Sequence, residues 1–83
     1  MYPNPVARGA SASLSLQQPV PGNYMVQLFS AAGSLVESMR MEGVNGARTE
    51  LLTIPGTVAA GLYFVRLQHE QTGKVYMQKV EVL

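Results

Sequence analysis

The stretch GLYFVRL, residues 61–67, decides the fold class of this chain. Its residues alternate with period two, so that Tyr63, Val65 and Leu67 share one face of an extended strand. A glycine two residues before a tyrosine, at the start of a late strand, is the local pattern of a tyrosine corner. In such a corner the tyrosine hydroxyl bonds to upstream backbone, as in Ig-like sandwiches. The stretch therefore predicts a half-buried β-strand that is anchored by Tyr63.

The same alternation recurs along the rest of the chain. It predicts six strands, which begin 11 to 14 residues apart, at residues 11–17, 23–29, 34–41, 47–54, 61–68 and 74–83. Stretches rich in glycine and proline separate them, and the connection at residues 55–61 is long for a hairpin, so we expect the chain to cross between two sheets there. We predict an all-β fold, specifically an Ig-like antiparallel β-sandwich of about seven strands with Greek-key connections.

The composition is that of one folded domain. The 83 residues are 47% apolar and 13% charged, a balance that excludes a disordered chain. Six basic and five acidic residues give a net charge of +1, and because the basic residues do not cluster, no nucleic-acid partner is expected. The apolar runs are too short to predict a transmembrane segment, and the N-terminus lacks the features of a signal peptide.

No group of side chains predicts an active site. The chain has no cysteine and no aspartate, and its one histidine, His69, is expected to be solvated at the tip of a hairpin. The five glutamates are scattered over predicted polar faces and turns. Ser11, Ser13 and Ser15 alternate along one strand, as on a solvated face. We therefore predict that the protein is not an enzyme, has no catalytic residues and binds neither a metal nor a cofactor.

Two phenylalanines are predicted on outward faces of the sheets. With Tyr24, Val26 and Leu28 directed inward, Phe29 points outward from its strand. Phe64 does the same in the strand at residues 61–68. Either a loop or the N-terminal segment covers these two rings, or Phe29 and Phe64 form part of a docking patch for a partner.

The terminal strand has two candidate inward faces. One holds Val80 and Val82 but also Gln78, and the other holds Lys79 and Leu83. We therefore expect a bulge to shift the register midway. The strand should pair with its predecessor on one side and leave an open sheet edge on the other. Such an edge is suited to β-augmentation, in which a partner adds a strand.

Four segments in this order resemble one known family. They are YPNPV at residues 2–6, VQLFSAAGSLV at 26–36, LLTIPGTVAAGLYFVRL at 51–67 and GKVYMQKVEVL at 73–83. Together they are similar to the C-terminal sorting domain of the type IX secretion system of Bacteroidetes. The family often has an aspartate shortly before its turn glycine, where this chain has Ser30, so any capping of that turn falls to a hydroxyl. The residues that match the family motifs are Tyr2, Pro3, Asn4, Pro5, Gly33, Gly61, Tyr63, Lys79 and Val80.

The resemblance implies a sorting signal rather than an enzyme. It implies an N-terminal cargo protein that is in the periplasm in transit and is then secreted or displayed at the cell surface. The implied partners are components of the type IX translocon and a sortase-like cysteine peptidase that normally removes the domain. On this reading residues 1–7 are a linker with the opening motif, Met1 is an added start residue, and residues 8–83 are the single sorting domain. The stiff segment at residues 2–5 is expected to keep the linker clear of the fold.

The resemblance also suggests which part of the domain the translocon reads. We hypothesise that it reads the terminal strand, through Lys79, Val80, Val82 and Leu83. Two alternatives share the fold class, a carbohydrate-binding module and a structural spacer of a secreted protein. The chain has no tryptophan, four tyrosines and two phenylalanines, which is a poor supply of aromatic platforms for sugars.

Overall fold

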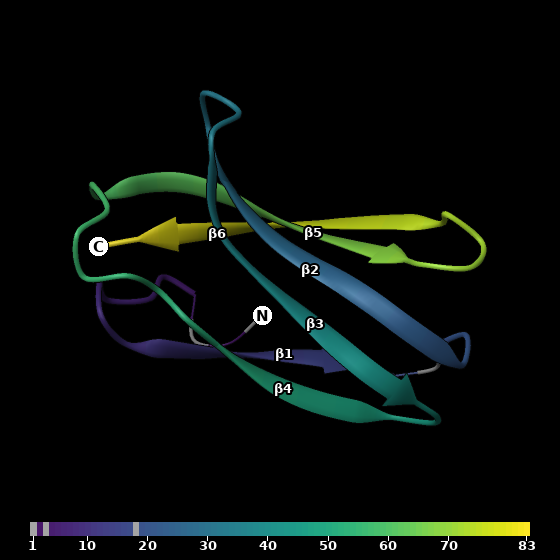
Figure 1. Ribbon diagram of the computed structural model, residues 1–83. Helices are drawn as coiled ribbons and strands as arrows, with labels where there is room; N and C mark the ends of the chain where they lie inside the picture. Colours follow the sequence, from purple (N-terminus) through teal and green to yellow (C-terminus); the bar gives the residue numbers. More distant parts are fainter. Residues whose placement is uncertain (1, 3, 18) are drawn as a thin grey trace.

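The computed structural model describes residue 2, residues 4–17 and residues 19–83, and the regular elements of this part of the chain are all β-strands (Figure 1). None of these residues forms a helix that could cross a membrane. The all-β prediction and the positions of the six strands are confirmed. The strands are β1 (Ser11–Leu16), β2 (Gly22–Ser30), β3 (Leu35–Val44), β4 (Arg48–Thr53), β5 (Gly61–His69) and β6 (Val75–Val82).

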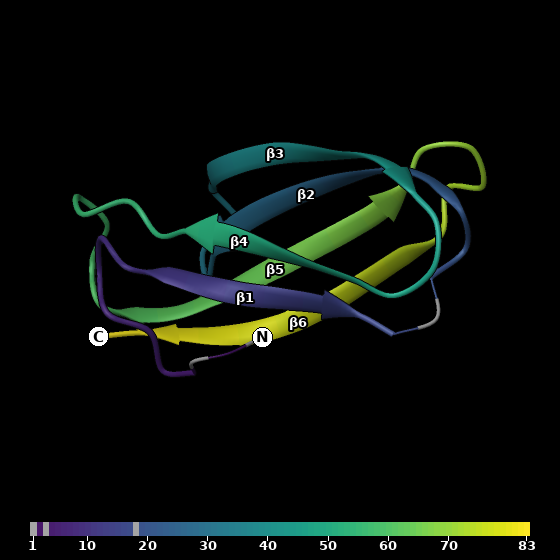
Figure 2. The ribbon, with the colours of Figure 1, turned by 90° about the horizontal axis from the view of Figure 1, so that it is seen from below.

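The strands form two antiparallel sheets that face each other (Figures 1 and 2). The smaller sheet pairs β1 with β4, and the larger has the order β3-β2-β5-β6. The chain forms the β2–β3 hairpin, crosses to the small sheet as β4, and returns through residues 54–60 to place β5 beside β2. The predicted crossing is therefore confirmed.

The expectation of about seven strands in an Ig-like Greek key is not confirmed, because six strands are present in the described residues. The segment that could have supplied another strand is the N-terminal arm, which we define as Tyr2 and residues 4–6. It makes only isolated bridges, from Tyr2 to Ser13 and from Val6 to Val82. Pro5 has no N–H to donate, so the arm does not form a continuous ladder.

The core lies between the two sheets and follows the predicted alternation. Tyr63, Val65 and Leu67 of β5 point inward, as do their counterparts on β2. The arm contributes as well, since Val6, which falls within the stretch expected to be a linker, is fully buried. The buried apolar residues are Val6, Ala12, Leu14, Tyr24, Val26, Leu28, Met41, Val44, Leu52, Ile54, Tyr63, Val65, Leu67, Val80 and Val82.

The β2–β3 turn is capped by a serine hydroxyl. Ser30 Oγ accepts a hydrogen bond from the Ser34 N–H at 3.1 Å, and the Ser30 C=O accepts one from the Gly33 N–H at 2.9 Å. Gly33 has a φ of +89°, a conformation that side chains disfavour. The weaker hydroxyl cap expected in place of an aspartate is therefore present.

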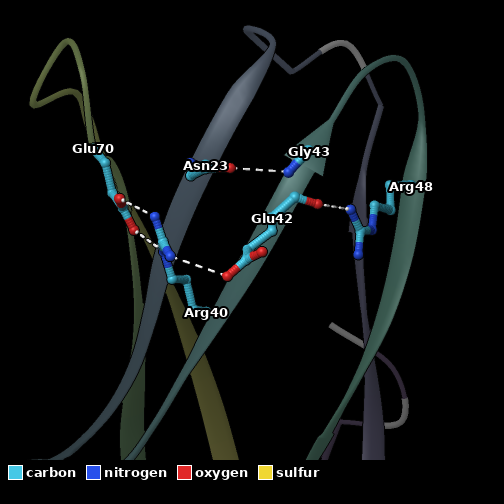
Figure 3. A network of polar contacts seen from close by, with 6 residues as sticks. All are labelled: Asn23, Arg40, Glu42, Gly43, Arg48 and Glu70. Atoms are coloured by element: carbon cyan, nitrogen blue, oxygen red, sulfur yellow. Dashed lines mark hydrogen bonds and ion pairs between the residues drawn. The ribbon is translucent and has the colours of Figure 1, made fainter.

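A polar network ties β2, β3 and β4 to the hairpin after β5 at one end of the sandwich (Figure 3). Arg40 of β3 donates to both carboxylate oxygens of Glu70, just after β5, over 2.7 and 2.9 Å, and also to Glu42 Oε1 over 3.0 Å. Arg48 at the start of β4 donates to the Glu42 C=O over 2.6 Å. Asn23 of β2 accepts the Gly43 N–H at 2.9 Å. These contacts fix the hairpin after β5 and the β3–β4 connection relative to each other.

Candidate functional site

A cross-strand line of side chains lies on the outward face of the larger sheet, and we call it the aromatic row. It consists of Leu35, Phe29, Phe64 and Lys79, one residue from each strand in the order β3-β2-β5-β6. Phe29 is directly opposite Leu35 on one side and Phe64 on the other, and Phe64 is opposite Lys79. The register thus brings together the two phenylalanines and the lysine that the sequence singled out separately.

The aromatic row is accessible from solvent. Both phenylalanines are half-buried, and Leu35 is 54% exposed. Leu62, opposite Glu81, and Met77, opposite Arg66, extend the apolar surface beside it, and Met77 is 56% exposed. Apolar side chains that gather in this way on a monomer are typical of an interaction surface.

The N-terminal arm does not cover the two phenylalanines. Its bridges to Ser13 and Val82 place it along β1 and β6, on the side of the sandwich where the two sheets meet (Figure 2). The arm is therefore not the cover that the sequence allowed for these rings, and it bridges β1 and β6 instead. The apolar part of the aromatic row can therefore contact a partner's side chains while Lys79 contacts an anionic group.

The terminal strand does not have the bulge predicted for it. β6 pairs with β5 in unbroken register from Gly61 opposite Val82 to Gln68 opposite Val75. Val80 and Val82 point into the core and are buried, whereas the residues of the same face nearer the start of β6 are exposed. The polar Gln78 needs no change of register, because the buried face of β6 extends only over its C-terminal half.

Of the four residues proposed for translocon recognition, two are buried in this strand and two are exposed. The side chains of Val80 and Val82 are buried, so only their backbone could take part in the recognition hypothesised for the terminal strand, and that hypothesis stays a prediction. Lys79 and Leu83 are exposed, and Leu83 is 58% exposed.

The edge of β6 is also less open than expected, because the N-terminal arm pairs with its C-terminal half. The Val6 N–H donates to the Glu81 C=O at 2.8 Å, and the Leu83 N–H donates to the Val6 C=O at 2.9 Å. The Asn4 side chain accepts the Glu81 N–H at 2.9 Å and donates to the Lys79 C=O at 3.2 Å.

Tyr2 and Asn4 of the opening motif are therefore part of the fold. Tyr2 and Asn4 make backbone or side-chain hydrogen bonds to the strands, and Pro5 lies between Asn4 and the buried Val6. Pro3, the remaining residue of the motif, lies outside the described residues, as does Met1.

Two tyrosine corners anchor the central strands, and one of them, at Tyr63, was predicted from the sequence. Tyr63 donates to the Ala59 C=O at 2.6 Å, which confirms the predicted corner. Tyr24 donates to the Val20 C=O at the same distance. The signal for the second was present, since Gly22 precedes Tyr24 at the spacing that Gly61 has from Tyr63. Burial is the main cause that raises the pKa of the Tyr24 phenol, which therefore remains a donor.

His69 is buried, so its predicted solvation is wrong. Its Nε2 lies 2.9 Å from the Pro21 C=O, while Nδ1 accepts the N–H groups of Gln71 and Thr72 at 3.3 and 3.1 Å. Because Nδ1 accepts two donors, Nε2 carries the proton and donates to Pro21. The ring also packs edge-on against Tyr24, with 4.9 Å between centroids. His69 is thus a structural residue that organises the β5–β6 hairpin.

Comparison with known proteins identifies a family. The family described as "Secretion system C-terminal sorting domain" matches residues 1–82. No curated protein and no solved structure matches the chain significantly.

Proposed function

Because the chain belongs to the C-terminal sorting domains of the type IX secretion system, we propose that the translocon reads this domain through the aromatic row. Family membership implies that the domain is a sorting signal, that a cargo protein precedes it, and that the protein is secreted or held at the cell surface. The observation that supports the aromatic row is the register that aligns Phe29, Phe64 and Lys79 across three strands.

The chemistry of this surface suits a signal that many cargo proteins share. The phenylalanines offer apolar area that a partner can cover, and the lysine offers a charge that orients the partner. The recognition site thus lies on the outward face of the larger sheet, so the translocon can bind it without contacting the cargo. The carbohydrate-binding and spacer alternatives have no comparable support, because the family match extends from residue 1 to residue 82.

The finer steps of the pathway are part of the same proposal. The cargo and its sorting domain are in the periplasm in transit, the translocon takes up the pair, and a sortase-like cysteine peptidase then removes the domain. The domain itself performs no reaction and needs no metal or cofactor.

A secretion assay tests this proposal. A fluorescent protein with a Sec signal and this domain at its C-terminus is expressed in a host with a type IX system. The exchange of Phe29 and Phe64 for serine should leave the fusion in the periplasm. The control is Leu51→Ser on β4, which removes an equally apolar side chain that is 63% exposed. Normal surface delivery of the double variant, after its folding has been checked, would contradict the proposed role of the row.

A further inference from the structure

The N-terminal arm runs in the gap between the small sheet and the large one, with a defined direction. It is antiparallel to β1 at the Tyr2–Ser13 bridge and parallel to β6 at the Val6–Val82 bridge. The chain upstream of Tyr2 is therefore directed toward the C-terminal end of β1 and, at the same time, toward the N-terminal end of β6.

A groove lies in that direction. It has a volume of about 200 Å³, and two of its walls come from the strands that the arm already contacts, while Gln17, Pro19, Tyr24 and Leu67 complete its lining. On the β1 side it is lined by Leu14, Ser15 and Leu16, and on the β6 side by Tyr76 and Gln78. The groove is thus the continuation of the space that the arm fills.

The backbone of both strands is oriented to receive a further strand there. Ser13 exchanges hydrogen bonds with Tyr2, so its N–H and C=O point away from β4, and alternation gives Ser15 the same orientation. On β6 the C=O of Glu81 points to Val6, so the backbone groups of Met77, four residues earlier, also point away from β5. Both walls of the groove therefore present backbone groups in the pattern of a sheet edge.

We propose that this groove binds the segment of chain immediately upstream of Tyr2 as an added strand that joins the two sheets. The inference rests on the proposed function, which places a cargo protein before the domain. The occupant is the protein's own chain, because the arm already directs that chain into the groove. Covalent attachment gives such a segment an effective concentration that a separate partner lacks.

The register of the arm specifies how the segment is seated. In a chain extended before Tyr2, with Met1 replaced, continuation of the Tyr2–Ser13 pairing would place the second added residue opposite Ser15, and the first and third opposite Leu14 and Leu16. Leu14 is buried and Leu16 is half-buried, so the first and third added side chains would point into the groove. The second, like exposed Ser15, points to solvent. Apolar residues are favoured at the first and third positions and polar residues at the second.

Amide hydrogen exchange on two extended forms of the full chain tests the proposal. In both forms a short segment replaces Met1 and stands directly before Tyr2. In one, the first and third upstream residues are valine and the second and fourth are serine, and in the other the valines and serines are exchanged. The composition, length and charge are thus identical, and no residue of the folded domain is changed.

The first form should slow the exchange of the Ser15 amide by about tenfold relative to the second, as expected when a new ladder hydrogen bond forms. The Leu14 amide, which belongs to the β1–β4 ladder, serves as the internal reference. Equal exchange at Ser15 in the two forms would overturn the proposal. Protection that grows with protein concentration would also overturn it, since the occupant would then be a second copy. The experiment needs no translocon, so its failure is distinguishable from a failure of the secretion assay.

Discussion

At the scale of single residues, two glycines with similar backbone conformations have different surroundings. Gly22 and Gly61 each precede a corner tyrosine by two residues and have φ angles of +138° and +149°. A Cβ on Gly22 would lie 2.7 Å from Nε2 of the buried His69, whereas a Cβ on Gly61 would meet nothing within 4 Å. An alanine at Gly61 therefore introduces backbone strain alone, whereas an alanine at Gly22 introduces backbone strain and a steric clash.

Gly61→Ala should destabilise the fold by about 1–3 kcal/mol through backbone strain alone. Gly22→Ala should cost more, because His69 is held by three hydrogen bonds and cannot move away cheaply. Urea denaturation of the two variants measures the difference. Equal midpoints would mean that the His69 ring is not fixed.

The corner hydroxyls provide a second prediction at this scale. Tyr24→Phe and Tyr63→Phe should each destabilise the domain by about 1 kcal/mol, because each leaves a backbone C=O without its tyrosine donor. Tyr24 pairs with His69 and Tyr63 with Ser30, at opposite ends of the β2–β5 pair, so the two losses should add in the double variant. Thermal or urea unfolding of the three variants checks this, and an unchanged midpoint for either single variant would show that its corner contributes nothing.

At the scale of elements, the ion pair between β3 and the hairpin after β5 should make stability depend on pH. The hydrogen bonds from Arg40 are the main cause that lowers the pKa of Glu70 from its ordinary value of 4.5. The native state therefore binds fewer protons at this group than the unfolded chain does. The stabilisation is fully present above pH 4.5 and is lost as the pH falls through the lowered native pKa.

Glu70→Gln should accordingly lower the urea midpoint at neutral pH, and its difference from the parent should shrink as the pH falls below 4.5. Glu37→Gln is the matched control, because within the described part of the chain Glu37 accepts a hydrogen bond from the neighbouring Ser38 N–H alone. The same pH-dependent difference in both variants would assign the effect to net charge rather than to the Arg40 pair.

The strands could be predicted from the sequence, but the depth of their burial could not. Period two alone identifies the inward residues of β5, and extended by one step beyond Leu67 it would have placed His69 on the buried face. The turn residues after His69 favoured a solvated tip instead. On β6 the alternation is equally regular throughout. Which half is buried depends on what the facing sheet and the arm cover, and this is not a local property of the sequence.

The candidate site, too, could be predicted from the sequence only in part. Phe29 and Phe64 could be assigned to outward faces from alternation, but their alignment with Lys79 required the pairing of three strands. The pairing of the arm with β6 was not foreseen because it joins residues more than seventy positions apart, as between Asn4 and Lys79.

At the scale of the whole molecule, the arm braces the two sheets. Val6→Ala should cost about 2 kcal/mol, because it removes two buried methyl groups and leaves a small cavity. Deletion of residues 2–7 should destabilise the domain further and free the backbone of β6 that now bonds to Asn4 and Val6. A freed edge favours self-association. Sedimentation should therefore show a shift from monomer toward dimers, and a monomeric deletion variant with an unchanged midpoint would contradict this role of the arm.

The contacts of the arm with the end of β6 also have a consequence for how the signal arises during synthesis. Val80 and Val82 belong to the core, and the backbone from Lys79 to Leu83 holds Asn4 and Val6. A nascent or truncated chain that stops short of Val80 lacks these two core side chains and the backbone that bonds to the arm, so it cannot close the sandwich around the arm. Only a polypeptide whose translation has run through β6 can therefore complete the fold of the sorting domain.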